Sequence, residues 1–342
     1  MSLQKYQESL GFIYNLWEKL GINVSHLTIE YVGGELLLLS ESEINSCVTM
    51  ARNFFDERGI VVRDGAQSNL IGSSRRIDNL FSIFDGRVGT SIDSFSDKRK
   101  FKGSATKYKT FFLHNESQLA SGKLTPAVYT FDADTIDNAL LEIDKAINDG
   151  RNLMVRPVFG GGMAVKMPDP ERVANLYVAA LERWWMKSDI RLEPFYSLAR
   201  KRVSSRLGVY SRENMDYCSF QSNCTVRSMS LEPSGDLYLC QDMADAGKSP
   251  IGNALRNFFD MQTWSNLNLR PARLDMSCYS CAYFKECQGG CLLKSLESGN
   301  GMYGKSDHCE AWKLMFRKID DLVDESMEGS LIKWLDRIEA KE

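Results

Sequence analysis

Cysteine is the residue type in this sequence whose number and spacing point to chemistry. Eight of the nine cysteines lie in one block of the chain: Cys218, Cys224, Cys240, Cys278, Cys281, Cys287, Cys291 and Cys309. Thiolates gathered so densely bind zinc or iron-sulfur clusters, or they pair as disulfides. Packing alone does not require so many, so we expect this block to be a metal or disulfide centre.

The composition of the chain favours metal over disulfides. Residues 1–8 are polar and hold no signal-peptide core, and no apolar run reaches the roughly eighteen residues of a membrane span. We therefore expect a cytoplasmic protein with no membrane partner, in which thiols stay reduced. The net charge of −3 predicts no nucleic-acid partner.

The spacing of the cysteines distinguishes zinc from iron-sulfur clusters. A zinc ribbon uses two C-x₂-C pairs, but here only Cys278 and Cys281 have that spacing, because Cys287 and Cys291 form a C-x₃-C pair. Eight cysteines fit two cubane clusters with four thiolates each, and this count leaves Cys47 over. A pair of zinc sites remains the alternative.

The segment before the cysteine block alternates strands and helices. We predict strands at 26–32, 59–63, 87–93, 126–130 and 152–158, and helices at 5–20, 40–55, 75–84 and 135–148. Such alternation predicts a parallel sheet with helices outside it, an α/β fold, and we expect the 26–32 strand to be buried. Ligands bind at the carboxyl ends of parallel strands. These ends are Gly33–Glu35, Gln67–Asn69, Asp93, Thr130 and Gly160–Gly162.

The rest of the chain contributes helices and one hairpin. We predict helices at 171–186, 194–207, 310–326 and 331–338, and a hairpin at 228–239 that turns at Pro233-Ser-Gly-Asp236. The cysteines therefore lie on loops between the hairpin and the helix at 310–326.

The spacing of the cysteine block resembles that of a known family. The order Cys224-x₁₀-Gly235-x₄-Cys240, then Cys278-x₂-Cys281-x₅-Cys287-x₃-Cys291-x₁₇-Cys309, resembles the SPASM extension of radical-SAM peptide and protein maturases. Cys218, placed as C-x₅-C before Cys224, resembles the anaerobic sulfatase-maturating members, whose eight cysteines bind two auxiliary 4Fe-4S clusters. By this resemblance, Cys218, Cys224, Cys240 and Cys291 hold the first cluster, and Cys278, Cys281, Cys287 and Cys309 hold the second.

Three strand ends resemble the motifs with which this family binds S-adenosylmethionine. Val32-Gly-Gly-Glu35 resembles GGEP, Ser68-Asn69 resembles TNG, and Val88-Gly-Thr-Ser-Ile-Asp93 resembles VGISLDG. The resemblance implies these cofactor-binding residues: Gly33, Gly34, Glu35, Ser68, Asn69, Ser91 and Asp93. Leu36 replaces the proline of the first motif, and Leu70 and Ser94 replace glycines of the other two.

The same resemblance implies an α/β fold made of an incomplete (β/α) TIM-like barrel and a cysteine-rich iron-sulfur domain. Residues 1–190 correspond to the barrel without its first strand and cysteine loop, and residues 191–215 to a helical bridge. Residues 216–312 correspond to the SPASM domain and residues 313–342 to the final helices.

The C-x₃-C-x₂-C motif that holds the radical-generating cluster of the family does not occur in this chain. Cys47 is the one cysteine before Cys218, and we expect it to pack as a small core residue within a helix. Two interpretations stay open: a truncated or mis-started enzyme, or a degenerate partner of a complete radical-SAM enzyme. S-adenosylmethionine binding stays open with them.

The resemblance implies an oxidoreductase-type maturase that acts on a peptide or protein. Its alternatives are a non-catalytic peptide-binding partner of a complete enzyme and a zinc-stabilised interaction protein. Sulfatase-type members carry an aspartate, a proposed base, directly after the third auxiliary cysteine. Here Gln241 takes that position and Asp242 follows, which makes Asp242 the candidate catalytic residue. We expect His308, beside Cys309, at the surface.

Overall fold

The computed structural model describes residues 1–119, 122, 124–161, 166–208, 218–220 and 223–340. The chain forms two compact units, which are described separately. Unit 1 comprises Met1–Val128, Leu231–Leu237 and Ile251–Asp260, and unit 2 comprises Tyr129–Ser230, Tyr238–Pro250 and Met261–Glu342. Among the described helices, none has both the length and the hydropathy of a membrane span.

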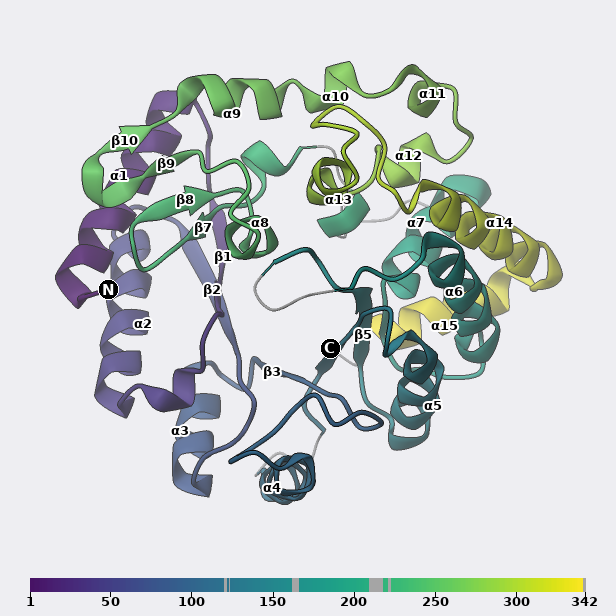
Figure 1. The fold of residues 1–342 in the computed structure, drawn as a ribbon, viewed down its shortest axis with the longest axis horizontal. Coiled ribbons are helices and arrows are strands. Elements are labelled where there is room, and N and C mark those ends of the chain that lie inside the picture. Colours follow the sequence, from purple (N-terminus) through teal and green to yellow (C-terminus); the bar gives the residue numbers. More distant parts are fainter. Residues whose placement is uncertain (120–121, 123, 162–165, 209–217, 221–222, 341–342) are drawn as a thin grey trace. The chain divides into compact units, whose positions relative to one another are not determined.

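Six strands form the main sheet in chain order. Figure 1 labels β1, β2, β3 and β5 of this sheet. They are β1 (His26–Tyr31), β2 (Val61–Gln67), β3 (Val88–Ser91), β4 (Ala127–Phe131), β5 (Leu153–Pro157) and β6 (Leu192–Glu193). The pairs β1–β2, β2–β3, β3–β4 and β5–β6 are parallel, and the boundary between the units falls within β4. A complete barrel of this kind has eight strands, so the prediction of an α/β fold with an incomplete barrel is confirmed.

Helices connect these strands, as the alternating pattern predicts. They are α1 (Leu3–Leu20), η1 (Leu36–Leu38), α2 (Glu41–Asp56), α3 (Ser74–Ile83), α4 (Ala105–Ser117), η2 (Ile136–Asn138), α5 (Ala139–Asp149), α6 (Pro170–Trp184) and α7 (Phe195–Leu207). The start of α2 shows how the sequence sets these limits. Ser40 and Glu43 form a capping box, in which each side chain accepts a hydrogen bond from the other residue's backbone N–H.

The core of unit 1 lies between its sheet and its first two helices. Leu10 of α1, Ala51 and Phe55 of α2, and Ile60 before β2 form one buried cluster. The apolar spacing along both helices places these side chains on the face that packs together. This layer supports β1 and β2, whose carboxyl ends carry the candidate cofactor residues.

The structure differs from the sequence prediction at β1, β2, α4 and β6. The sequence pattern missed β6, which has only two residues, and α4, whose buried face includes the polar Asn115 and Glu116 and therefore lacks an apolar repeat. β1 was expected to be buried, but its residues are half-buried or exposed, because within the described sheet it pairs with β2 alone. β2 extends to Gln67, whereas the predicted strand ended at residue 63.

The helical core of unit 2 joins α6 and α7 to α14 (Cys309–Glu325) and α15 (Glu328–Glu339). Tyr177 of α6 stacks on Trp312 of α14 at a centroid distance of 5.2 Å, and Trp184 contacts Trp334 of α15 at 4.7 Å. Buried aromatic pairs of this kind add packing energy beyond their apolar area. They fix α14, whose first residue is Cys309.

Short elements connect the cysteines. They are η3 (Cys218–Phe220), η4 (Cys224–Val226), β7 (Ser230–Leu231), β8 (Asp236–Tyr238), α8 (Gln241–Asp245), β9 (Gly252–Asn253), η5 (Ala254–Arg256), β10 (Phe258–Phe259), α9 (Met261–Asn268), α10 (Arg270–Arg273), α11 (Met276–Tyr279), α12 (Phe284–Cys287) and α13 (Leu292–Glu297). The predicted hairpin is present as β7 and β8. The sequence pattern missed β9 and β10, which extend it to a sheet in the order β10-β9-β8-β7.

Candidate functional site

The carboxyl ends of β1 and β2 meet at Glu35. Its carboxylate accepts hydrogen bonds from the Ser68 hydroxyl (2.7 Å), the Asn69 backbone N–H (2.8 Å) and the Leu37 backbone N–H (3.1 Å). Gly33 and Gly34, directly before it, have φ values of 84° and 57°. The structure thus brings together five of the seven predicted cofactor residues. Three of the roughly four acceptor sites of the Glu35 carboxylate are already occupied by the protein itself.

Leu70 takes the place of a glycine in the family motif and keeps a glycine-like backbone. Its φ is +55° and its side chain is completely buried. Its N–H donates to the Ser68 hydroxyl oxygen (3.1 Å), and its carbonyl accepts from Asn115 (2.6 Å). The turn at the end of β2 is therefore held by hydrogen bonds even though a non-glycine residue is strained in this region.

The remaining two predicted cofactor residues lie at the end of β3. Ser91 accepts a hydrogen bond from the Gln67 side chain (2.6 Å), and Asp93 accepts one from the Ser96 backbone (3.2 Å). The sequence pattern missed Tyr108, whose hydroxyl lies 3.5 Å from the Ser91 carbonyl oxygen. Burial raises the pKa of Tyr108, a hydrogen bond and charge from Arg99 lower it, and the charges of Asp93 and Glu35 raise it. Tyr108 and Arg99 therefore lie close to the predicted cofactor residues Asp93 and Glu35.

Four cysteines of unit 2 form a first group. Burial is the largest cause that raises the pKa of Cys218, Cys224 and Cys240, and the charge of Cys291 raises all three further. The pKa of Cys224 rises to about 11 and that of Cys218 to about 12, although Cys218 as a whole residue is exposed. The charge of Cys218 also raises the pKa of Cys240, so these thiols lie close enough to interact electrostatically.

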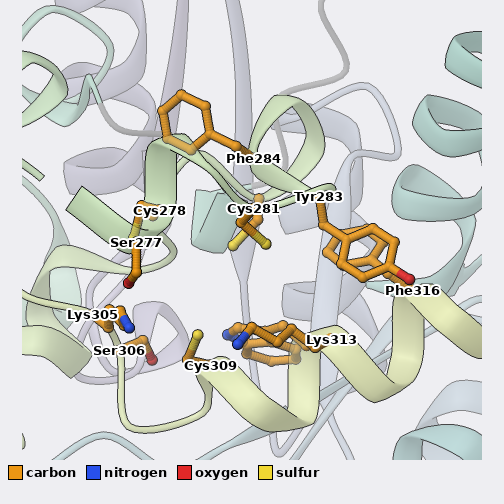
Figure 2. A pocket seen from close by; sticks show the side chains of 13 residues that line it. Ser277, Cys278, Cys281, Tyr283, Phe284, Lys305, Ser306, Cys309, Lys313 and Phe316 are labelled. Atoms are coloured by element: carbon orange, nitrogen blue, oxygen red, sulfur yellow. The ribbon is translucent and has the colours of Figure 1, made fainter. Parts of the chain in front are cut away.

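The other four cysteines form a second group and line one pocket (Figure 2). This group consists of Cys278, Cys281, Cys287 and Cys309, and the space between the lining side chains is about 480 Å³, part of it open solvent. Burial raises the pKa of Cys287 to about 12, and the charges of Cys309, Cys278 and Cys281 raise it as well. Figure 2 shows the amino groups of Lys305 and Lys313 flanking Cys309.

Each group offers four thiols, which is the ligand requirement of one 4Fe-4S cluster, so the residues present fit two such clusters. Within the described residues, no three His, Cys, Asp or Glu side chains converge closely enough to hold a single metal ion. Burial raises the pKa of Cys224 to about 11 and that of Cys287 to about 12, so these two thiols are neutral near pH 7 and must release their protons when they bind metal.

Two short helices of unit 2 connect the first group to the end of β5. Cys240 is the N-cap of α8 and Cys291 is the N-cap of α13. The loop after β5 contacts both helices. Gly160 N–H donates to Glu297 of α13 (2.5 Å), and a Cβ added to Gly161 would lie 2.7 Å from the Asp245 backbone of α8. Only glycine permits that approach. Gly162 lies outside the described residues.

Asp242, the candidate base, is paired with a cation. Both of its carboxylate oxygens accept hydrogen bonds from Arg156 of β5, each at 3.1 Å. A substrate proton would have to compete with this bidentate ion pair, which also ties α8 to the sheet strand. Gln241 accepts a hydrogen bond from Ser230 (3.3 Å) and donates one to Asp245 (2.9 Å).

Two expectations about single residues were wrong. His308 was expected at the surface, but only 1% of it is exposed, because α14 packs against α6 and its ring lies 5.8 Å from that of Trp312. Cys47 was expected in the core, but it is only partly buried on α2. No sequence signal marks the buried state of His308, since a histidine next to a cysteine suits either environment. Thr130 lies within β4 and is exposed.

The fold is similar to solved structures of anSMEcpe, an anaerobic sulfatase-maturating enzyme. Polyhistidine-tagged anSMEcpe with bound AdoMet shares 14% identity at a TM-score of 0.69, over 98% of this chain and 88% of that chain. Native anSMEcpe with bound AdoMet and the Kp18Cys peptide shares 15% identity at a TM-score of 0.66, over 93% of this chain and 89% of that chain. No protein-family model and no curated protein matches the sequence. At these identities the similarity shows that the fold is shared, and no more.

Proposed function

We propose that this chain binds two auxiliary 4Fe-4S clusters and takes part in the post-translational modification of a peptide or protein. The observation that carries this proposal is the division of eight cysteines of unit 2 into two groups of four. Cys218, Cys224, Cys240 and Cys291 would hold the first cluster, and Cys278, Cys281, Cys287 and Cys309 the second. The chain holds no C-x₃-C-x₂-C motif, so we propose that the radical is generated either by a complete radical-SAM partner or by a segment of the same protein that this sequence does not include.

Neighbouring residues in both cysteine groups favour the anionic thiolate form of the ligands. Burial raises the pKa of Cys291, and hydrogen bonds from the backbone N–H groups of Lys294 and Leu293 oppose that rise. Burial also raises the pKa of Cys309, and the charges of Lys313 and Lys305 oppose it. Bound clusters would supply one-electron chemistry, and these hydrogen bonds and charges would stabilise their thiolate ligands.

Peptide binding is supported by the comparison structures, two of which contain a peptide together with AdoMet. A second candidate function is a non-catalytic peptide-binding partner. One observation favours it: the Glu35 carboxylate, which in the family motif contacts the amino group of S-adenosylmethionine, is already held by Ser68, Asn69 and Leu37. A zinc-stabilised interaction protein is the third candidate.

Metal analysis after anaerobic purification tests the proposal. We expect about eight irons and eight sulfides per chain, because each four-iron cubane needs four thiolates. Cys291→Ser and Cys309→Ser should each leave about four irons, since each removes a ligand of a different cluster. Cys47→Ser is the matched control and should keep the wild-type count. Zinc without sulfide in the wild-type protein would refute both iron-sulfur functions.

A further inference from the structure

Arg270, the first residue of α10, is a buried cation without a described anionic partner. Its side chain is 1% exposed, and within the described residues no carboxylate forms an ion pair with it. Among the described residues, its guanidinium donates only to neutral carbonyl oxygens, and its Nε atom has no hydrogen-bond partner there. A charge buried in this way is unfavourable unless an opposite charge lies near it.

The hydrogen bonds of Arg270 place it where the two cysteine groups join. Nη2 donates to the carbonyl oxygens of Gly289 (3.1 Å) and Gly290 (3.4 Å), and Nη1 donates to those of Met302 and Gly304. Gly289 and Gly290 are the last two residues before Cys291 of the first group, and Gly289 follows Cys287 of the second group by two residues. The guanidinium therefore holds the segment that crosses from one group to the other.

The electrostatic surroundings agree with this position. Burial lowers the pKa of Arg270, while the charges of Cys291, Cys224, Cys278 and Cys287 raise it, two from each group. The cation thus lies within range of both sets of thiols. Two four-thiolate clusters would provide the negative charge that the surrounding carbonyl groups do not.

We propose that Arg270 is the shared counter-ion of both clusters and that it raises the reduction potential of each. This inference rests on the proposed function. Reduction adds a negative charge to a cluster, and a buried cation stabilises the reduced form more than the oxidised form. Charge and hydrogen bonds near the sulfurs are what set such potentials. Arg270 acts through its position and does not need to contact a substrate.

The test is an EPR-monitored redox titration with dithionite of anaerobically purified wild-type, Arg270→Gln and Arg270→Lys proteins, together with iron and sulfide counts. We expect Arg270→Gln either to lower both potentials or to lose iron, because its charge is gone. Arg270→Lys should keep both clusters at potentials closer to those of the wild type. Arg273→Gln, an exposed arginine on the same helix, is the matched control and should change neither potential nor iron content.

The outcomes separate this inference from the proposed function. Unchanged potentials in a fully loaded Arg270→Gln protein would overturn it, and so would an Arg270→Lys protein that loses its clusters as completely as Arg270→Gln, since charge would then not be the cause. Both results leave the wild-type count of about eight irons intact. A wild-type protein that binds zinc and no sulfide would instead refute the proposed function itself.

Discussion

At the scale of single residues, Leu70 shows how a family motif can change its side chain and keep its backbone. Left-handed backbone costs a non-glycine residue about 1–2 kcal/mol. Leu70 has φ +55°, yet its side chain is fully buried. Burial of a leucine side chain stabilises a protein by about 1.5–3 kcal/mol, which is enough to offset the strain. The sequence shows only the loss of a glycine, whereas the structure shows what replaces it.

We predict that Leu70→Gly is more stable than Leu70→Ala by about 1 kcal/mol. Both variants lose the buried side chain, but only glycine adopts positive φ without strain. Chemical denaturation of both variants measures the difference. Ile77, which is equally buried but lies within α3, is the control, and there the order should reverse, with Ile77→Gly less stable than Ile77→Ala. The same order at both positions would show that the backbone at Leu70 is not strained.

At the scale of elements, the turn from Cys287 to Cys291 connects the two cysteine groups. Gln288, Gly289 and Gly290 all have positive φ, with values of 51°, 86° and 72°. Three successive residues in the left-handed region reverse the chain, which allows Cys287 to join one group and Cys291 the other. The C-x₃-C spacing that argued against a zinc knuckle is the sequence signature of this turn.

We predict that Gly289→Ala destabilises the protein and lowers its iron content. A Cβ there would meet Leu274 at 2.6 Å, in addition to the strain of positive φ. Gly299→Ala is the matched control, because its φ is 78° but no atom lies within 4 Å of the added Cβ. Both should lose about 1 kcal/mol from strain, and Gly289→Ala should lose at least that much again.

Thermal denaturation and iron analysis of the two glycine variants measure this difference. Gly299→Ala should keep about eight irons, and Gly289→Ala should fall toward about four. Equal melting temperatures and equal iron contents in the two variants would contradict a special role for this turn.

At the scale of the whole molecule, the cysteines are distributed unequally between the units. Eight lie in unit 2, while unit 1 holds Cys47 alone and carries the predicted S-adenosylmethionine residues. In the radical-SAM family that the sequence resembles, the radical-generating cluster needs three closely spaced cysteines, and this sequence has no such set before Cys218. The two cysteine groups and the predicted S-adenosylmethionine residues therefore belong to different units. Neither unit contains the three closely spaced cysteines of a radical-generating cluster.

We predict that the reduced, iron-loaded protein forms no deoxyadenosine from S-adenosylmethionine. Chromatography after incubation with dithionite measures the product, and a complete radical-SAM enzyme serves as the positive control. Calorimetry then measures whether the chain binds S-adenosylmethionine, which distinguishes a maturase scaffold from a non-catalytic partner. If the predicted residues bind S-adenosylmethionine, Glu35→Gln should weaken that binding about tenfold or more, because a charge-assisted contact is lost. Substantial deoxyadenosine from this chain would refute the inference that it cannot generate the radical itself.

The sequence by itself determined the α/β class, five of the six strands of the main sheet and most of its helices. Period-two and period-3.6 apolar patterns and caps such as Ser40 and Glu43 are local signals. The resemblance also predicted which four cysteines belong to each group. That each group binds a cluster remains a prediction. The two-residue β6 carries too little pattern to be recognised, and α4 buries polar residues that hide its period.

Only the tertiary structure decided what surrounds each candidate residue. Asp242 meets Arg156, Glu35 is occupied by its neighbours, and His308 is buried, and each of these facts depends on segments far apart in the chain. Arg270 is the clearest case, because no motif marks it. Its burial and its carbonyl partners come from loops that meet only in the folded protein, where desolvation makes an ordinary arginine depend on nearby negative charge.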